Sequence, residues 1–224
     1  MKRIELRFSV SEAAGSVAAL LWRPDPARQL LVLGHGAGAG MRHVFMDAIC
    51  EALAARAIAT FRYQFPYAEQ GKRRPDARAT LLATVRAALR EARERASDLP
   101  LLAGGKSMGG RMTSLALAEE PNARVRGLVF LGFPLHAAGR PARERAEHLE
   151  RVSQPMLFLQ GTRDSLADLA LLRPVCTGLG PRAQLHIVEG GDHSFKVLKR
   201  SERSAEEVLE ELARAVEDWA RARC

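Results

Sequence analysis

A stretch near the middle of the chain, AGGKSMGGRMT at 103–113, contains residues that could carry out two different chemistries. The triplet Gly105-Lys106-Ser107 resembles the end of a phosphate-binding loop, in which backbone N–H groups surround a nucleotide phosphate. The pattern Gly105-x-Ser107-x-Gly109 is instead typical of a sharp turn between a strand and a helix that exposes a nucleophilic serine. The surrounding residues distinguish between the two interpretations.

The phosphate-loop interpretation fails at its first position. Such a loop requires a glycine five residues before the glycine of the GKS triplet, and the residue there is Pro100. In addition, no apolar run ends in an acidic residue clearly suited to bind the magnesium ion of a nucleotide. We therefore favour the serine-turn interpretation.

The residues on both sides of Ser107 agree with a turn between a strand and a helix. PLLAGG at 100–105 is an apolar run typical of a buried strand, whereas the residues after the turn place Met112 and Leu115 on one helical face. A serine on such a turn has a strained backbone, and the flanking glycines avoid steric collisions. The helix that begins here directs the positive end of its dipole toward a developing oxyanion.

An aspartate and a histidine follow the serine in the order expected of a Ser–Asp–His triad. Asp164 follows the apolar run 155–161, and His193 follows the apolar run 183–189. Both residues thus lie just beyond the carboxyl ends of predicted strands, where α/β sheets place their sites. We predict that Ser107 is the nucleophile, His193 the general base and Asp164 the residue that orients the histidine.

Neighbouring acidic residues and histidines have less suitable contexts. Asp168 is a reserve acid one helical turn after Asp164, and Asp164 could also serve as the N-cap of the helix that follows. We expect Asp192 to face away from the site. His186 lies within a predicted strand, and we expect it to pack in the core.

The glycine-rich run LLVLGHGAGAG at 30–40 also permits two interpretations. Gly34, Gly36 and Ala39 satisfy the G-x-G-x-x-A pattern of a dinucleotide-binding turn. The acidic ribose ligand expected about 20 residues later is missing, and Arg62 stands there instead. An NADP-binding protein therefore remains as an alternative.

In the serine-turn interpretation, which we favour, the same run forms the loop that faces the nucleophile. We predict that the backbone N–H groups of Ala37 and Met108 form the oxyanion hole, which stabilises the negative charge that develops on the substrate carbonyl oxygen. We expect His35 only to brace this loop. Gly38 and Gly40 allow the backbone to approach the substrate closely.

Short apolar runs alternate with longer segments of helical period along the chain. The apolar runs lie at 4–10, 16–22, 29–34, 57–63, 100–105, 125–132, 155–161 and 183–189. Several are continuously apolar, as a parallel sheet buried on both faces requires. The alternation predicts an α/β fold in a single domain, residues 1–224, with the first two runs paired as an antiparallel hairpin at the sheet edge.

The composition is that of a soluble globular protein, with 47% hydrophobic and 27% charged residues. The net charge of +8 fits either a nucleic-acid or acidic partner or basic groups on solvated helix faces, interleaved with glutamate. We favour the second explanation and predict neither a nucleic-acid partner nor a membrane partner. No run approaches the roughly 18 apolar residues of a membrane span, and the first residues do not resemble a signal peptide.

The three cysteines, Cys50, Cys176 and Cys224, are scattered and show no spacing typical of metal ligands. An odd number of isolated cysteines is typical of a protein from a reducing compartment. We therefore predict a cytoplasmic location, with Cys50 and Cys176 as small core residues.

These motifs resemble those of the α/β-hydrolase superfamily, and in particular its small, cap-less branch known as dienelactone hydrolase-like or predicted α/β hydrolases. The resemblance covers nearly the whole chain and rests, in order, on GHGAGAG, FRYQFPYAEQGKRRPD, GGKSMGGRM, GFPLH, LFLQGTRD and GGDHSF. It implies an α/β-hydrolase fold, with a mostly parallel eight-stranded sheet, helices on both faces and no large cap domain. Dienelactone hydrolases proper use a cysteine nucleophile, whereas position 107 here is serine.

The implied activity is a serine hydrolase that cleaves a small ester, thioester or lactone through an acyl-enzyme, without a metal or organic cofactor. The only candidate for a lid is the short segment 135–153, which indicates an open cleft. Arg62, Tyr63, Phe65 and Tyr67 either line that cleft or pack within their loop.

Two further points stay open at the level of sequence. Lys106 and Arg111 flank the nucleophile and would favour an anionic substrate if both faced the cleft. The alternative function from a different class is a non-catalytic interaction module that keeps the fold without turnover.

Overall fold

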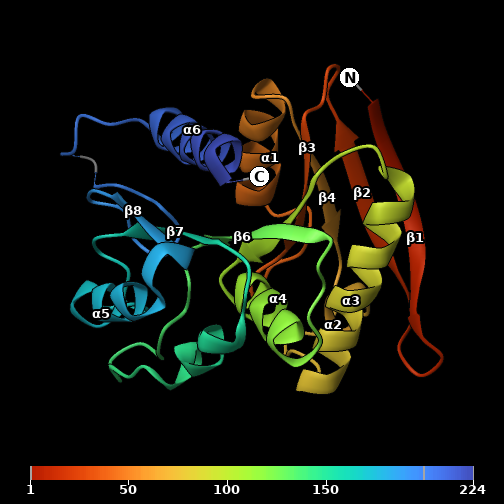
Figure 1. Ribbon diagram of the computed structural model, residues 1–224, viewed down its shortest axis with the longest axis horizontal. Helices are drawn as coiled ribbons and strands as arrows, with labels where there is room; N and C mark the ends of the chain where they lie inside the picture. The colour runs from red at the N-terminus through yellow and green to blue at the C-terminus, as the bar shows by residue number, and fades with distance from the viewer. Residues whose placement is uncertain (1, 199, 224) are drawn as a thin grey trace.

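The computed structural model describes residues 2–198 and 200–223, which form an eight-stranded sheet with helices on both faces (Figure 1). The strand order is β1-β2-β4-β3-β5-β6-β7-β8. The strands are β1 (Lys2–Ser11), β2 (Gly15–Arg23), β3 (Gln29–Gly34), β4 (Ile58–Tyr63), β5 (Leu101–Lys106), β6 (Val125–Leu131), β7 (Met156–Gly161) and β8 (Ala183–Val188). Each predicted apolar run is therefore a strand.

The first two strands pair antiparallel to each other at one edge of the sheet, as predicted, and β2 pairs antiparallel to β4. All pairings from β4 to β8 are parallel. The carboxyl ends of these parallel strands therefore meet along one edge of the sheet, where the residues that follow them come together.

The connecting segments are mostly helical. The helices are α1 (Val44–Ala55), α2 (Pro66–Glu69), α3 (Arg78–Arg95), α4 (Met108–Glu119), α5 (Leu169–Leu179) and α6 (Ala205–Arg223), with the 3₁₀ helices η1 (Glu144–Arg151) and η2 (Gly180–Arg182). Figure 1 shows α1 and α6 on one side of the sheet and α3, α4 and α5 on the other. The sheet thus separates two layers of helices.

Each face of the sheet has its own hydrophobic core. Side chains alternate along β3, so that Leu31 and Leu33 pack in the core beneath α1 and α6, whereas Leu30 and Val32 pack in the core of the opposite face. Because both faces of this central strand are covered, its sequence is continuously apolar instead of alternating.

The segment between β6 and β7, which contains the predicted lid candidate 135–153, forms no cap domain. Its 3₁₀ helix η1 buries Ala146, His148 and Leu149. The His148 Nε2 atom lies 2.7 Å from the Ser114 hydroxyl of α4. The segment therefore packs beside α4.

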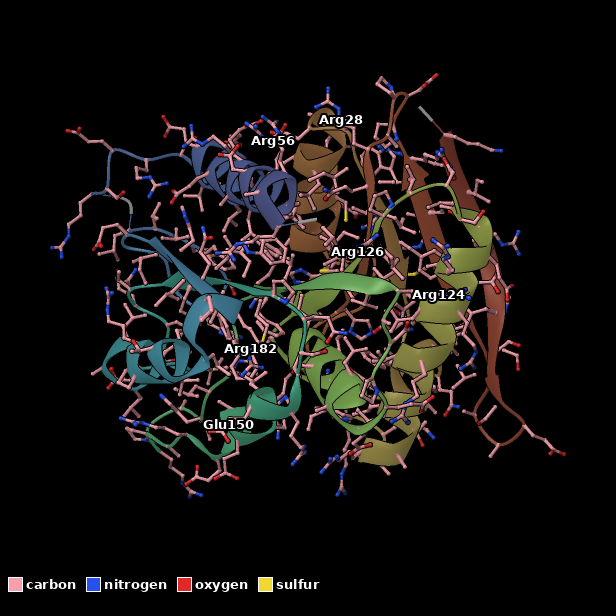
Figure 2. The ribbon with its side chains drawn as sticks, in the orientation of Figure 1. Arg28, Arg56, Arg124, Arg126, Glu150 and Arg182 are labelled. Atoms are coloured by element: carbon pink, nitrogen blue, oxygen red, sulfur yellow. The ribbon has the colours of Figure 1, made fainter. Side chains whose placement is uncertain are left out.

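The arginines that give the chain its positive charge are spread over the molecule. Arg56 pairs with Glu210 and Glu217 of α6, and Arg86 pairs with Glu119 at the end of α4. In Figure 2 the labelled arginines lie in three regions: Arg28 with Arg56, Arg124 with Arg126, and Arg182. This distribution agrees with solvated surfaces that carry both signs of charge.

Within the described residues, no helix is long and apolar enough to cross a membrane.

We predict that Trp219→Ala greatly weakens the packing of α6 on the sheet. Trp219 is buried, and a Cβ atom added at Gly127 of β6 would lie 2.4 Å from its ring. Loss of such a side chain typically lowers the free energy of unfolding by about 3–5 kcal/mol, which urea denaturation would measure. The control, Asp218→Ala at the adjacent exposed position, should change it by less than about 0.5 kcal/mol. Equal effects of the two substitutions would contradict this account.

Candidate active site

Ser107 stands on a strained turn between β5 and α4, as the sequence predicts. Its backbone angles are φ 50° and ψ −115°, a conformation that residues other than glycine rarely adopt. Ser107 occupies the N-cap position of α4, but its side chain makes no capping hydrogen bond. The hydroxyl is therefore free to bond to another group.

Glycines at two positions of this turn permit a very close backbone contact. A Cβ atom at Gly109 would lie 2.1 Å from the carbonyl oxygen of Gly34, and one at Gly105 would lie 2.3 Å from the same oxygen. Any side chain at either position would therefore push the turn away from the end of β3. The glycines thus allow the serine turn to pack directly on β3.

The structure brings the three predicted triad residues into one chain of hydrogen bonds. The His193 Nε2 atom lies 2.8 Å from the Ser107 Oγ atom, and the His193 Nδ1 atom lies 2.7 Å from the Asp164 Oδ2 atom. The Asp164 side chain is 1% exposed and that of His193 is 22% exposed. A buried carboxylate that accepts the Nδ1 proton leaves Nε2 free to accept the serine proton.

Asp164 is held in place by two further donors. Its Oδ1 atom accepts a hydrogen bond of 2.7 Å from the Leu166 backbone N–H. Its Oδ2 atom also accepts a hydrogen bond from the side-chain amide of Gln160, whose own oxygen accepts one of 3.0 Å from the Phe133 backbone N–H. Sequence analysis did not identify Gln160 as a site residue. The only signal was one amide within the apolar run MLFLQ.

The neighbouring acidic residues have other roles. Asp168, the reserve acid, caps α5 by accepting a hydrogen bond of 2.8 Å from the Ala170 backbone N–H, so Asp164 is not the cap of that helix. The Asp192 side chain accepts hydrogen bonds from the backbone N–H groups of Ser194 and Lys196, at 2.7 and 2.9 Å. Asp192 therefore holds its own loop together.

The prediction that His186 packs in the core is wrong. Its side chain is 31% exposed, and its Nε2 atom lies 2.7 Å from the Glu211 carboxylate of α6. The reason is that β8 is the edge strand of the sheet, so only part of it is covered by α6.

Lys106 turns away from solvent and toward the histidine loop. Its ammonium group donates a hydrogen bond of 2.6 Å to the backbone carbonyl oxygen of His193. Burial lowers the pKa of Lys106 to about 8, although the negative charges of Asp164 and Asp192 act in the opposite direction. Lys106, the residue before the nucleophile, is therefore hydrogen-bonded to the backbone of the triad histidine.

The loop after β3 lies directly beside the nucleophile. A Cβ atom at Gly36 would lie 3.7 Å from the Ser107 Cβ atom. Ala37 follows at an exposed position, and Met108 is the first residue of α4, where backbone N–H groups have no partner within the helix. This placement is compatible with the predicted oxyanion hole, which stays a prediction.

His35 braces this loop from below, as expected. Its Nδ1 atom donates to the Gly36 carbonyl oxygen at 2.8 Å, and its Nε2 atom accepts from the Phe65 backbone N–H at 3.2 Å. Burial lowers the pKa of His35 to about 4. The imidazole is therefore neutral near pH 7, as an acceptor at Nε2 requires.

The prediction that Arg62, Tyr63, Phe65 and Tyr67 line the substrate cleft is wrong. All four side chains are buried, with Arg62 and Tyr67 1% exposed and the other two 0%. They form the packed layer beneath the loop after β3, because β4 lies between β2 and β3 and its end is covered by that loop. The alternative of loop packing is the correct one.

The burial of Arg62 also weakens the dinucleotide-binding interpretation. Its guanidinium donates to Asp47 at 2.5 Å and to the Met41 carbonyl oxygen at 3.0 Å, so it is not available to a nucleotide phosphate.

Across residues 2–198 and 200–223, no cluster of three or more His, Cys, Asp or Glu side chains is placed to hold a metal ion.

Comparison with known proteins agrees with the fold. A family model described as an alpha/beta hydrolase domain matches residues 27–221, and the chain therefore belongs to this family of α/β hydrolases.

Solved structures of hydrolases share the fold over nearly the whole chain. A dienelactone hydrolase from Anabaena variabilis is 19% identical with a TM-score of 0.79, covering 99% of this chain and 98% of its own. An α/β serine hydrolase without a lid from Xanthomonas campestris is 20% identical with a TM-score of 0.73, covering 98% and 95%. Est1E from Butyrivibrio proteoclasticus is 15% identical with a TM-score of 0.72, covering 98% of both chains. This chain thus has the α/β-hydrolase fold of the cap-less type.

We predict that the free energy of unfolding decreases as the pH is lowered from about 6.5 to about 4. His35 and His148 are both buried, and burial lowers the pKa of each from 6.5 to about 4. In this interval the histidines of the unfolded chain bind protons more readily than those of the folded protein. Each histidine therefore lowers the free energy of unfolding by up to about 3 kcal/mol as the pH falls. Urea denaturation at several pH values would measure the decrease.

A variant of His148 isolates one of the two contributions. His148→Gln retains an N–H donor to the Ser114 hydroxyl but does not titrate. We expect its free energy of unfolding to depend on pH about half as strongly between pH 6.5 and 4. An unchanged pH dependence would show that this histidine does not contribute.

Proposed function

We propose that this protein is a serine hydrolase that cleaves a small ester, thioester or lactone through an acyl-enzyme. The observation that carries the proposal is the unbroken chain of hydrogen bonds from Asp164 through His193 to Ser107. Its proposed partner is a small-molecule acyl substrate. Structural likeness to a dienelactone hydrolase, an esterase domain and a serine hydrolase without a lid supports hydrolytic activity.

In the first step, the Ser107 oxygen attacks the carbonyl carbon of the substrate while its proton passes to the Nε2 atom of His193. Asp164 stabilises the resulting imidazolium. The negative charge on the carbonyl oxygen rests on the backbone N–H groups of Ala37 and Met108, and loss of one such donor typically costs about 3–4 kcal/mol. The carbon–heteroatom bond then breaks, and His193 gives its proton to the leaving group.

In the second step, water takes the place of the leaving group. His193 removes a proton from the water molecule, which attacks the acyl carbon and releases the carboxylic acid from Ser107. The serine hydroxyl regains its proton from His193. The reaction thus consumes only the substrate and one water molecule, and it returns Ser107, His193 and Asp164 to their starting protonation states.

Two side chains outside the triad hold its members in this arrangement. Gln160 fixes the carboxylate of Asp164, and Lys106 fixes the backbone of His193. These contacts restrict the orientation of the catalytic groups, which is the main contribution of such outer residues to rate.

We also propose that the protein works in the cytoplasm. Cys50 and Cys176 are buried free thiols, and burial raises the pKa of each to about 11. Two inert, reduced core thiols are typical of a protein from a reducing compartment.

We predict that a fluorophosphonate probe forms one adduct with the protein, on Ser107. A serine activated by an adjacent histidine reacts with such a probe, whereas an ordinary surface serine does not. Intact-protein mass spectrometry would detect the adduct, and peptide mapping would locate it. The Ser107→Ala variant is the control and should gain no mass. An unmodified protein that is correctly folded would favour the non-catalytic interaction module.

We predict that Lys106→Met lowers kcat by about 10–100-fold with little change in KM. Hydrogen bonds to charged groups are worth about 1.5–3 kcal/mol, and this one positions His193 without contacting the substrate. Steady-state kinetics with an ester substrate would measure both constants. The control, Lys72→Met, removes the same charge from an exposed position and should leave kcat unchanged. A change confined to KM would instead place the ammonium against the substrate.

A further inference from the structure

An apolar groove of about 720 Å³ lies between the first turn of α1, segment 194–198 and the first turn of α6. Figure 1 shows α1 and α6 side by side on the same face of the sheet. Among the described residues, the only large apolar side chains that are exposed are Val44 and Leu198, and both line this groove. Its volume falls within the range of ligand sites, roughly 300–1,000 Å³.

Aromatic rings connect this groove to the triad. Phe45 of α1 stacks on Phe195, with ring centroids 5.8 Å apart. The ammonium nitrogen of Lys106 also lies 5.7 Å from the centre of the Phe195 ring. The groove therefore begins at Ser194, the residue after His193, and one of its lining rings, Phe195, lies next to the side chain of the residue that precedes Ser107.

The wall formed by segment 194–198 is held in one conformation. Phe195 has φ +61°, which is strained for a bulky residue. The strain is held by hydrogen bonds from the backbone N–H groups of Ser194 and Lys196 to the Asp192 side chain, and from the Phe195 N–H to the Asp192 carbonyl oxygen. Strain of this kind persists only where the surrounding contacts enforce it, and it is typical of functional loops. These contacts thus fix residues 194–196 of the groove wall.

We propose that this groove binds the apolar leaving group of the substrate, so that the natural substrates are esters or thioesters of aliphatic alcohols or thiols. The assignment rests on the proposed function, in which His193 gives its proton to the leaving heteroatom. That atom must lie against His193, and the residues that follow His193 form the wall of the groove. The leaving group then covers the exposed Val44 and Leu198 side chains, and the removal of this apolar surface from water favours binding.

The test compares ester series in which only one side of the ester bond changes. Acid released from ethyl, butyl and hexyl acetate is titrated at constant pH, and the same is done with ethyl butyrate and ethyl hexanoate. We expect kcat/KM to rise about tenfold from ethyl to hexyl acetate, since each methylene that enters an apolar site adds to transition-state binding. The acyl series should change much less.

Variants of the groove identify its contribution. We expect the double variant Val44→Ser/Leu198→Ser to lower the ratio of kcat/KM for hexyl over ethyl acetate by at least about threefold. Both positions are exposed, so the fold is expected to tolerate the change. The matched control is Ala55→Ser, at the exposed far end of the same helix and outside the groove, and it should leave the ratio unchanged.

The outcomes separate this inference from the proposed function. Suppose that ethyl acetate is hydrolysed but kcat/KM for hexyl acetate is about equal to that for ethyl acetate. The groove then does not bind the leaving group. The same conclusion follows if the double variant has the same ratio of these two constants as Ala55→Ser. If the rate rises along the acyl series alone, the assignment to the leaving group is wrong. If no ester is hydrolysed and Ser107 also fails to react with the fluorophosphonate, the proposed function itself is wrong.

Discussion

The backbone approaches itself more closely where β3, β5 and α4 meet than side chains would allow. A Cβ atom added at Gly105 would lie only 2.3 Å from the Gly34 carbonyl oxygen, and one added at Gly109 only 2.1 Å from it. This contact holds the strained serine turn against the end of β3, and it sets the loop at Gly36 beside Ser107. Nucleophile and predicted oxyanion donors are therefore positioned by one backbone contact.

The second requirement of the site is that a histidine from a distant loop reaches this turn. His193 follows β8, the far edge strand of the parallel part of the sheet, whereas Ser107 follows the central β5. Three contacts hold that loop in place: Lys106 with the His193 carbonyl oxygen, Asp164 with the imidazole, and the internal hydrogen bonds of Asp192. The same loop carries Phe195 away toward α1, so a single strained segment both presents the base and forms the groove wall.

The strands and the triad positions could be predicted from sequence because their signals are local. A strand buried on both faces needs a continuous apolar run, and residues after parallel strands share one sheet edge. Asp164 and His193 each follow such a run, and the glycines beside Ser107 mark its turn. Gln160 gave no comparable signal, because an amide in a strand reveals its partner only when the neighbouring loop is placed beside it.

The sequence by itself determined the α/β alternation, the serine turn and the chain order of the three site residues, since all of these follow from side-chain type and short spacings. Tertiary structure alone decided which surfaces are covered. Arg62, Tyr63, Phe65 and Tyr67 lie at and just after the carboxyl end of β4, close to where site residues occur, yet their side chains are buried because the loop after β3 lies over them. Conversely, Val44 and Leu198, 154 residues apart in sequence, share one groove because α1 and the histidine loop pack together. Burial depends on contacts between distant segments, and no local pattern encodes them.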